Sequence, residues 1–415
     1  MNIEMQKRSF WNYIGPGVLV AVGYMDPGNW ATDLEAGSRF GYQLLCVVLF
    51  SSVIAMTLQA FCVRVGVVTG KDLAELCRDR YQPVVRNLLW ILAEVAIIAT
   101  DVAEVLGTAL AFHMLFGFTI ETGVLMTAIN MVFVFILQGK GLRRLESIVL
   151  SFVVVILCCF IVQVFLSSPH WDQVALGFIP RWENFRNPHT MYVAIGILGA
   201  TVMPHNLYLH TAVVQSRSLN STPEEVRRSL WMITWEVLLS LTVAFFINAS
   251  ILIVSATVFY FNDYREVTEI QEAYKLLSPL MGASIASFLF AVALFAAGQS
   301  STITGAIAGQ VILEGFLNIK MPIWFRRLIA RILAIVPAWV GVHLLGESAV
   351  GKLLVGTQVI LSLQLPFAMV PLVLFARDKK LMGMWVLSKK LQFVGAILCA
   401  VVIAANIFML VQLFS

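Results

Sequence analysis

The sequence predicts an all-α integral membrane protein, and its composition carries that prediction. Charged residues make up 13% of the 415 residues, against roughly 25% in soluble proteins, and hydrophobic residues make up 59%. So few charges cannot cover a water-exposed surface. The apolar residues also form long continuous runs, whereas a membrane β-barrel would show weak alternation over segments of about ten residues. The composition therefore excludes a chain of soluble domains.

Eleven runs are apolar and long enough to cross a bilayer, which needs about 20 helical residues per crossing. They lie near residues 14–35, 43–65, 88–116, 121–138, 147–167, 190–212, 231–258, 282–317, 324–345, 349–376 and 392–414. We expect the following division of the chain: a cytoplasmic N-terminus (1–13), five spans (14–167), an external loop (168–189), five further spans (190–376) and a last span (392–414).

Lysine and arginine are distributed unevenly between the predicted loops. With the N-terminus in the cytoplasm, 21 of the 28 fall on the cytoplasmic side, 6 fall outside, and only Arg331 lies within a span. Basic residues favour the cytoplasmic side of membrane proteins. We therefore expect a multi-pass protein of the cell (inner) membrane with a cytoplasmic N-terminus and, because the span number is odd, an external C-terminus.

Two classes of partner are not expected. The net charge of +4 reflects orientation in the membrane and predicts no nucleic-acid-binding face. Residues 346–352 (GESAVGK) resemble a phosphate-binding loop, but Leu353 stands where Ser or Thr must hold Mg²⁺, and no strand precedes the loop. We therefore expect no bound nucleotide.

Spans 1 and 6 contain matching interruptions. Span 1 holds GYMDPGN from residue 23 and span 6 holds ATVMPHN from residue 200, so that Pro27 and Pro204 lie 177 residues apart. Since five spans separate the start of span 1 from the start of span 6, the second copy starts from the opposite face of the membrane. Proline cannot donate the helical hydrogen bond, which frees the carbonyls of Gly23 and Ala200. Paired breaks in inverted halves indicate a transporter's central site, with two unrelated proline kinks as the alternative.

The groups at these breaks suit a metal ion. They are the Asp26 carboxylate, the Asn29 amide oxygen, the Met203 thioether, and the carbonyls of Gly23 and Ala200. A carboxylate in the middle of a membrane indicates function. Oxygen donors bind hard and borderline cations, and a thioether favours softer ones. The set therefore points to Mn²⁺, Fe²⁺, Cd²⁺ or Co²⁺ rather than Mg²⁺, although Met203 by itself could simply fill the core.

Three stretches resemble the Nramp family of proton-coupled divalent-metal transporters. They are residues 23–30 (GYMDPGNW), 200–211 (ATVMPHNLYLHT) and 298–317 (GQSSTITGAIAGQVILEGFL). The resemblance covers essentially the whole chain. It implies a LeuT-like fold of two inverted five-helix repeats plus one extra span, eleven transmembrane helices in all, with spans 1 and 6 broken.

The resemblance also implies roles for individual residues. The family's metal ligands fall on Asp26, Asn29, Met203, the carbonyls of Ala200 and Gly23, and Gln358 in span 10. Its supporting polar network falls on Gln59, Thr201 and Asn248. Where the family often has Asn in span 2, this chain has Ser52, which is a departure in that network.

Span 3 carries three carboxylates, Glu94, Asp101 and Glu104, and no basic residue of its own. At 100° per residue they lie along one face of the helix. Fixed ion pairs between helices are one interpretation, with Arg331 as the cation. The resemblance favours a proton pathway along these three carboxylates, which leads from Asp26, directly or through His205, to Asp101 and Glu104 and has Arg331 as partner. His210 could relay protons or simply form hydrogen bonds.

The expected function is therefore secondary active import of Mn²⁺ or Fe²⁺ with protons, by alternating access. No enzymatic activity and no cofactor are expected, because the metal is the cargo. The alternatives are a related Mg²⁺ or Al³⁺ transporter, against which Met203 argues, and a membrane metal sensor that does not transport. The sequence predicts no particular oligomeric state.

Overall fold

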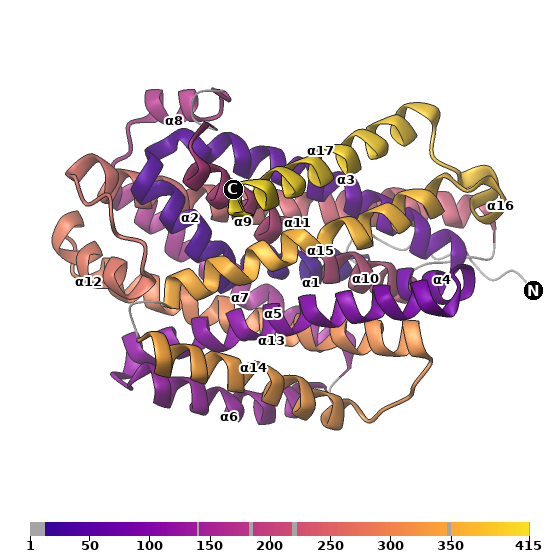
Figure 1. Cartoon of the computed structure of the whole chain (residues 1–415), viewed down its shortest axis with the longest axis horizontal. Helices are drawn as coiled ribbons and strands as arrows, with labels where there is room; N and C mark the ends of the chain where they lie inside the picture. Colours follow the sequence, from indigo (N-terminus) through magenta and orange to yellow (C-terminus); the bar gives the residue numbers. More distant parts are fainter. Residues whose placement is uncertain (1–12, 139–140, 182–185, 218–221, 347–349, 415) are drawn as a thin grey trace, which may run out of the picture.

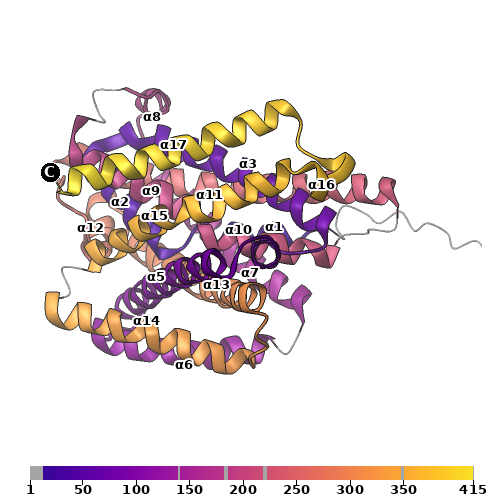
Figure 2. The same ribbon diagram turned by 45° about the vertical axis from the view of Figure 1, so that its right-hand side comes forward.

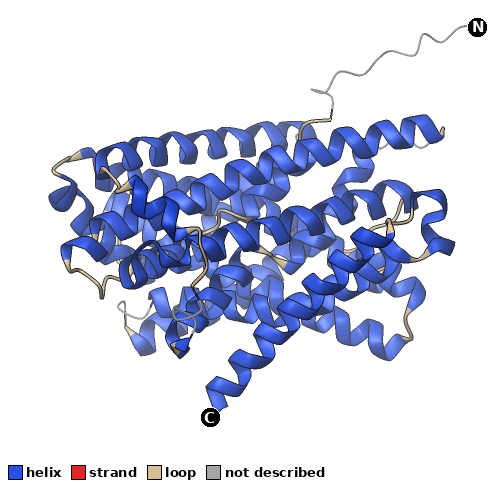
Figure 3. Ribbon diagram, turned by 90° about the horizontal axis from the view of Figure 1, so that it is seen from above, coloured by secondary structure: helices blue, strands red, loops and turns tan. Residues whose placement is uncertain are grey.

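The structure, a computed structural model, describes residues 13–138, 141–181, 186–217, 222–346 and 350–414. Residues 1–12 of the expected cytoplasmic N-terminus, Lys140, and residues 347–349 of the loop that resembles a phosphate-binding loop lie outside the described residues. Figure 3 shows helices joined by short loops throughout the described part of the chain. Eight helical segments of that part are long and apolar enough to cross a membrane.

Helices occupy every predicted span (Figure 1). In chain order the spans are α1 (Pro16–Gly23) with α2 (Pro27–Phe40), α3 (Leu45–Thr69), α5 (Pro83–Phe116), α6 (Ile120–Gln138), α7 (Leu142–Ser167), α9 (Pro188–Thr201) with α10 (Pro204–Val213), α11 (Pro223–Val258), α13 (Ile285–Leu317), α14 (Ile323–Leu345), α15 (Val350–Arg377) and α17 (Lys389–Phe414). Both predicted breaks are confirmed, since α1 stops at Gly23, α2 starts at Pro27, and α9 and α10 meet between Thr201 and Pro204.

Within the described residues, four short α-helices between the spans were not predicted. They are α4 (Leu73–Arg80), α8 (Trp171–Gly177), α12 (Ile270–Met281) and α16 (Lys379–Met382). Helices α4 and α16 lie at one end of the bundle and α8 and α12 at the other (Figure 1). The loops expected on opposite faces of the membrane therefore lie at opposite ends of the molecule.

The broken helices form the centre of the bundle. Helix α2 packs against α11, α9 and α15, while α10 packs against α3, α13 and α15. Helix α5 runs along α13, and α14 and α6 form an outer layer beside α5 (Figure 2). This arrangement buries every residue of α1 and keeps the two breaks away from lipid.

Candidate metal site

Asp26 begins helix α2 and keeps one carboxylate oxygen free. Its Oδ1 accepts a hydrogen bond of 2.9 Å from the backbone N–H of Asn29, which caps the helix. Its Oδ2 has no hydrogen-bond partner among the described residues, although the residue is 0% exposed. Leaving a buried carboxylate oxygen unpaired is costly. This oxygen is therefore available to a ligand that the chain itself does not supply.

Asn29 also presents a free oxygen, and the structure shows why. Its Nδ2 donates 3.0 Å to the carbonyl of Tyr24, and Asn248 Nδ2 donates 2.8 Å to the same carbonyl. Because a carbonyl only accepts, each amide must turn its NH₂ group toward Tyr24. The Oδ1 atoms of Asn29 and Asn248 are consequently the unpartnered ends.

Span 6 contributes sulfur and a carbonyl. Met203 occupies the N-cap position of α10, is 0% exposed, and packs with Ala96 and Ala99 of α5 and Leu361 of α15. Ala200 is buried in the last turn of α9. Its carbonyl lacks the usual helical donor because Pro204 has no N–H. The predicted donors of span 6 thus lie at the break, as their sequence positions require.

Glycines bring the two broken helices and α15 into close contact. A Cβ on Gly23 would overlap the amide of Asn206, so the first break lies against α10. A Cβ on Gly28 would overlap the side chain of Gln358, and a Cβ on Gly199 would overlap the Gln358 carbonyl. Gln358 therefore lies between α2 and α9, and its Oε1 has no partner. The structure places it where a further oxygen ligand could act.

A chain of hydrogen bonds supports the first break. Gln59 Nε2 donates 2.7 Å to the Tyr24 hydroxyl, and Gln59 Oε1 lies 2.7 Å from His210 Nδ1. Since that oxygen only accepts, Nδ1 of His210 carries the proton in this arrangement. His210 is therefore tied to the segment between α1 and α2.

The departure at position 52 has a visible consequence. The hydroxyl of Ser52 donates 2.8 Å to Val48 of its own helix. Ser52 shares a narrow cavity with Tyr24, Thr201 and Asn248 and makes no described hydrogen bond to any of them. An Asn side chain at position 52 would reach further into the polar network beside the break than the Ser52 hydroxyl does.

The carboxylates of α5 face α13 and α14 but are held differently. Glu94 forms a two-pronged ion pair with Arg326 at 2.9 Å for each oxygen and accepts 3.2 Å from Trp90 Nε1. A Cβ on Gly305 would lie 3.0 Å from Glu104 Oε1 and 3.6 Å from Asp101 Oδ1. The carboxylates of Asp101 and Glu104 therefore lie side by side. Glu94, in contrast, fits the interpretation that the acids form fixed ion pairs between helices.

Arg331 is not the only buried cation near these acids. Arg326, Arg327 and Arg331 are 7%, 6% and 6% exposed, and all three line a cavity of about 30 Å³ with Asp101. That volume is enough for an ordered water molecule. Arg331 itself donates 3.2 Å to the carbonyl of Thr127 on α6. The expectation that only Arg331 lies within a span was wrong, because Arg326 and Arg327 also lie in the first turns of α14, against α5.

His205 connects the two regions. Its Nδ1 lies 3.3 Å from the hydroxyl of Thr100, the residue before Asp101 on α5. Both Glu104 oxygens are buried without a described partner. The structure thus places His205, beside the second break, next to the helix that carries the acids.

Sequence reasoning missed two residues near the breaks. Asn206 is 0% exposed with both amide atoms unpartnered, and its equivalence to Asn29 in the repeated motif was the available signal. Asp33 on α2 is 2% exposed, has an unpartnered oxygen, and lies close enough for its charge to act on Asp26. Its position inside the predicted first span, 14–35, was the available signal.

The kinds of side chain at the breaks limit how a metal could be bound. Within the described ranges, no group of three or more His, Cys, Asp and Glu side chains could hold a metal, so any metal here needs the mixed donor set.

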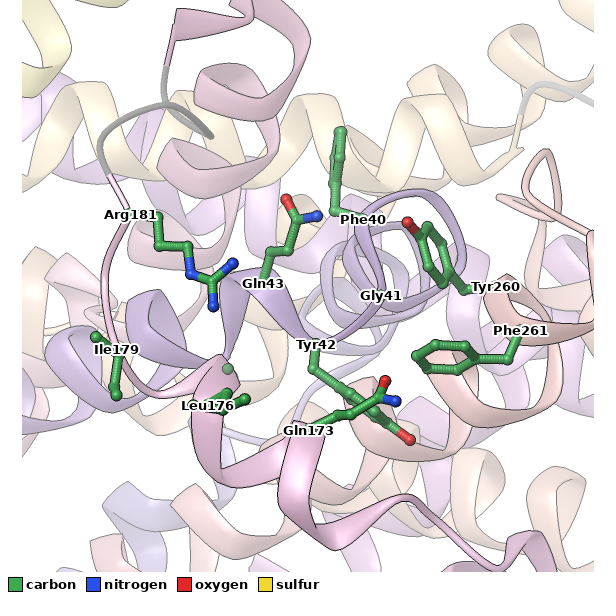
Figure 4. Close-up of a pocket in the computed structure, with 11 residues that line it drawn as sticks. Phe40, Gly41, Tyr42, Gln43, Gln173, Leu176, Ile179, Arg181, Tyr260 and Phe261 are labelled. Carbon is green, nitrogen blue, oxygen red and sulfur yellow. The ribbon is translucent and has the colours of Figure 1, made fainter.

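A separate cavity of about 320 Å³ lies at the far end of α2, between η2 (Gly41–Leu44), α8 and η5 (Tyr260–Asn262). There Arg181 lies beside Gln43, and the aromatic rings of Phe40, Tyr260 and Phe261 lie on the other side of the cavity (Figure 4). The positive charge of Arg181 disfavours a cation.

Comparison with known proteins agrees with this geometry. Residues 17–412 match the family model for natural resistance-associated macrophage protein-like (Nramp) proteins. The chain is 54% identical over 398 residues to divalent metal cation transporter MntH 1 of Pseudomonas aeruginosa, covering 96% of this chain and 91% of that one. It is 49% identical over 408 residues to MntH of Ralstonia nicotianae, covering 98% and 92%.

Solved structures extend the comparison to the fold. The Eremococcus coleocola manganese transporter matches with a TM-score of 0.89 and 36% identity, over 98% of this chain and 87% of that one. The nucleobase-cation symporter Mhp1 matches with a TM-score of 0.65 at 15% identity, over 95% and 91%, which confirms the LeuT-like fold alone. These relatives are named as transporters, and this chain is a multi-pass membrane protein and not an enzyme, as expected. The chain belongs to the Nramp family.

Proposed function

We propose that this chain imports divalent transition-metal ions, chiefly Mn²⁺ and also Fe²⁺, Cd²⁺ and Co²⁺, together with protons by alternating access. The observation that carries the proposal is the pair of buried, unpartnered oxygens, Asp26 Oδ2 and Asn29 Oδ1, at the first helix break. The names of the relatives support the same cargo, since they are divalent metal cation and manganese transporters.

The proposed ligands are Asp26, Asn29, Met203, Gln358 and the carbonyls of Ala200 and Gly23. Met203 supplies a soft donor that favours Mn²⁺ and Fe²⁺ over Mg²⁺ and Ca²⁺. Asp26 is the only anion in this set, so a bound divalent ion leaves about one net positive charge. Metal entry therefore favours the ionised carboxylate and release of its proton.

Alternating access follows from the burial of the site. Asp26, Asn29 and Met203 are each at most 1% exposed, so helices must move before metal can enter or leave. The proposed moving units are the two inverted groups of five spans, 14–167 and 190–376. The short unwound segments between α1 and α2, and between α9 and α10, are natural hinges for that motion.

The proposed proton pathway leads from Asp26 past His205 to Asp101 and Glu104. The hydrogen bond between His205 and Thr100, and the water-sized cavity at Asp101, support this route. Arg331 and its neighbouring arginines offset the negative charge of ionised acids there. In this proposal Glu94 serves as an anchor for Arg326 at the edge of the pathway, and His210 holds Gln59 in place.

The proposed orientation has the N-terminus in the cytoplasm, the C-terminus outside, and the chain in the cell (inner) membrane. The basic residues that flank α4 and α16, at one end of the bundle, support it. The proposed partners are therefore metal ions, protons and the lipid bilayer.

Purified protein in liposomes tests the proposal against its rivals. We expect Mn²⁺ uptake that accelerates when the outside is acidified, with Fe²⁺, Cd²⁺ and Co²⁺ competing and Mg²⁺ not competing. A metal sensor would bind Mn²⁺ without flux. A transporter adapted to Mg²⁺ or Al³⁺ would show competition by those ions instead. Either result would overturn the proposed cargo or mechanism.

A further inference from the structure

A groove on the outside of the bundle has no part in the metal site. It lies between α3, the first half of α11, and the segment that leads from η7 (Gly383–Trp385) into α17. Its volume is about 550 Å³, which is the size of a small-molecule binding pocket. Trp385 and Leu387, which follow α16 in the chain, line the groove. Helix α16 lies at the proposed cytoplasmic end of the bundle (Figure 1).

The groove combines an apolar wall with two arginines. Arg64 on α3 and Arg227 on α11 both line it, and no acidic side chain is among its described lining residues. Arg64 donates 3.2 Å to the carbonyl of Trp385 with Nη1, which holds that guanidinium at the edge of the groove. Arg227 is exposed and forms no ion pair with any described residue. Two positive charges therefore face the groove without compensation.

Tryptophans mark the depth of the groove in the membrane. Trp231 and Trp235 are 58% and 48% exposed, lie in edge-to-face contact at 6.3 Å, and line the groove with Trp385. Tryptophan concentrates where the hydrocarbon core meets the headgroups. The arginines lie toward the end of the bundle and the apolar wall lies toward its middle. The groove therefore crosses the boundary between the headgroup region and the hydrocarbon core, as a phospholipid does.

We propose that this groove binds one anionic phospholipid, with its phosphate on Arg64 and Arg227 and an acyl chain along the apolar wall. Unpaired arginines between transmembrane helices on the cytoplasmic side recognise anionic headgroups. The lipid would join α3 and α11 to the segment before α17. This site is independent of metal transport.

The test measures lipid binding by native mass spectrometry of detergent-purified protein titrated with phosphatidylglycerol or phosphatidylcholine. We expect selective binding of phosphatidylglycerol and a loss of about fivefold in its affinity for Arg227→Gln, since one arginine near the membrane surface contributes about that factor. Arg86→Gln, which removes a charge outside the groove, is the matched control and should bind as the wild type does. Ala60→Trp fills the groove without changing charge and should also remove the bound lipid.

Three outcomes would overturn the proposal. They are equal binding of both lipids, an unchanged phosphatidylglycerol affinity in both Arg227→Gln and Ala60→Trp, and displacement of the lipid by inorganic phosphate, which would indicate a site for free anions. Thermal melting in the presence of each lipid supplies a second reading. Phosphatidylglycerol should raise the midpoint of the wild type and of Arg86→Gln more than that of Arg227→Gln.

Discussion

Two substitutions at Met203 separate the role of its sulfur from the role of its bulk. The side chain is 0% exposed between α5 and α15. Met203→Leu keeps nearly the same volume without the thioether, and such volume-conserving changes cost less than about 1.5 kcal/mol of stability. Met203→Ala also removes the thioether, but it leaves a cavity beside Ala96, Ala99 and Leu361 and costs about 2–5 kcal/mol.

The assay is Mn²⁺ uptake into liposomes with increasing Ca²⁺ outside, together with the thermal midpoint of each variant. Because both variants lack the soft donor, both should lose discrimination against Ca²⁺. Only the Ala variant should also melt at a clearly lower temperature. If Met203→Leu excluded Ca²⁺ as well as the wild type does, the thioether would not carry selectivity. If only the Ala variant lost selectivity, packing would be the cause.

Three further predictions follow from single contacts. Asp101→Asn should reduce proton flux more than Mn²⁺ binding; equal loss of both in liposomes would favour a purely structural ion-pair role. Gly28→Ala places a Cβ on the side chain of Gln358 and must displace that side chain, so Mn²⁺ uptake should fall. Unchanged uptake would remove Gln358 from the site. Glu269, outside the spans at the start of α12, has its pKa raised from 4.5 to about 7 by burial, and its carboxylate accepts 2.6 Å from the backbone N–H of Gly351. The native protein therefore binds more protons than the unfolded chain between pH 4.5 and about 7, and stability falls as pH rises through that window. Glu269→Gln should remove this dependence of the thermal midpoint on pH. A midpoint that falls with pH in the variant as in the wild type would contradict the raised pKa of Glu269.

The sequence was sufficient for the features that local chemistry determines. Proline has no N–H, and the matched positions of Pro27 and Pro204 in the repeat predicted the two breaks. Proline alone is not sufficient for a break, because Pro337, Pro366 and Pro371 lie inside α14 and α15. The eleven apolar runs became helices because lipid leaves the backbone no other partner. The Asp26 and Met203 positions followed from the repeat, and the structure places each as the first residue before a helix.

The rest depended on contacts between helices that no single segment encodes. Arg326 and Arg327 stand near the end of a span, and only the packing of α14 on α5 decides that they face acids rather than water. The free oxygen of Asn29 depends on the Tyr24 carbonyl, which a second amide from α11 also holds. The short helix α4 begins with a capping box at Asp72, but its polar sequence gave no span-like signal.

The most direct test of the central claim is Mn²⁺ uptake and Mn²⁺ binding by Asp26→Asn. The neutral amide keeps the shape of the side chain and removes the one anionic ligand proposed at the breaks. Asp263→Asn is the control, because Asp263 is an exposed acid of the loop after α11 and should transport normally. We predict that Asp26→Asn is folded, binds Mn²⁺ weakly and does not transport it; uptake equal to that of the wild type would contradict a metal site at Asp26.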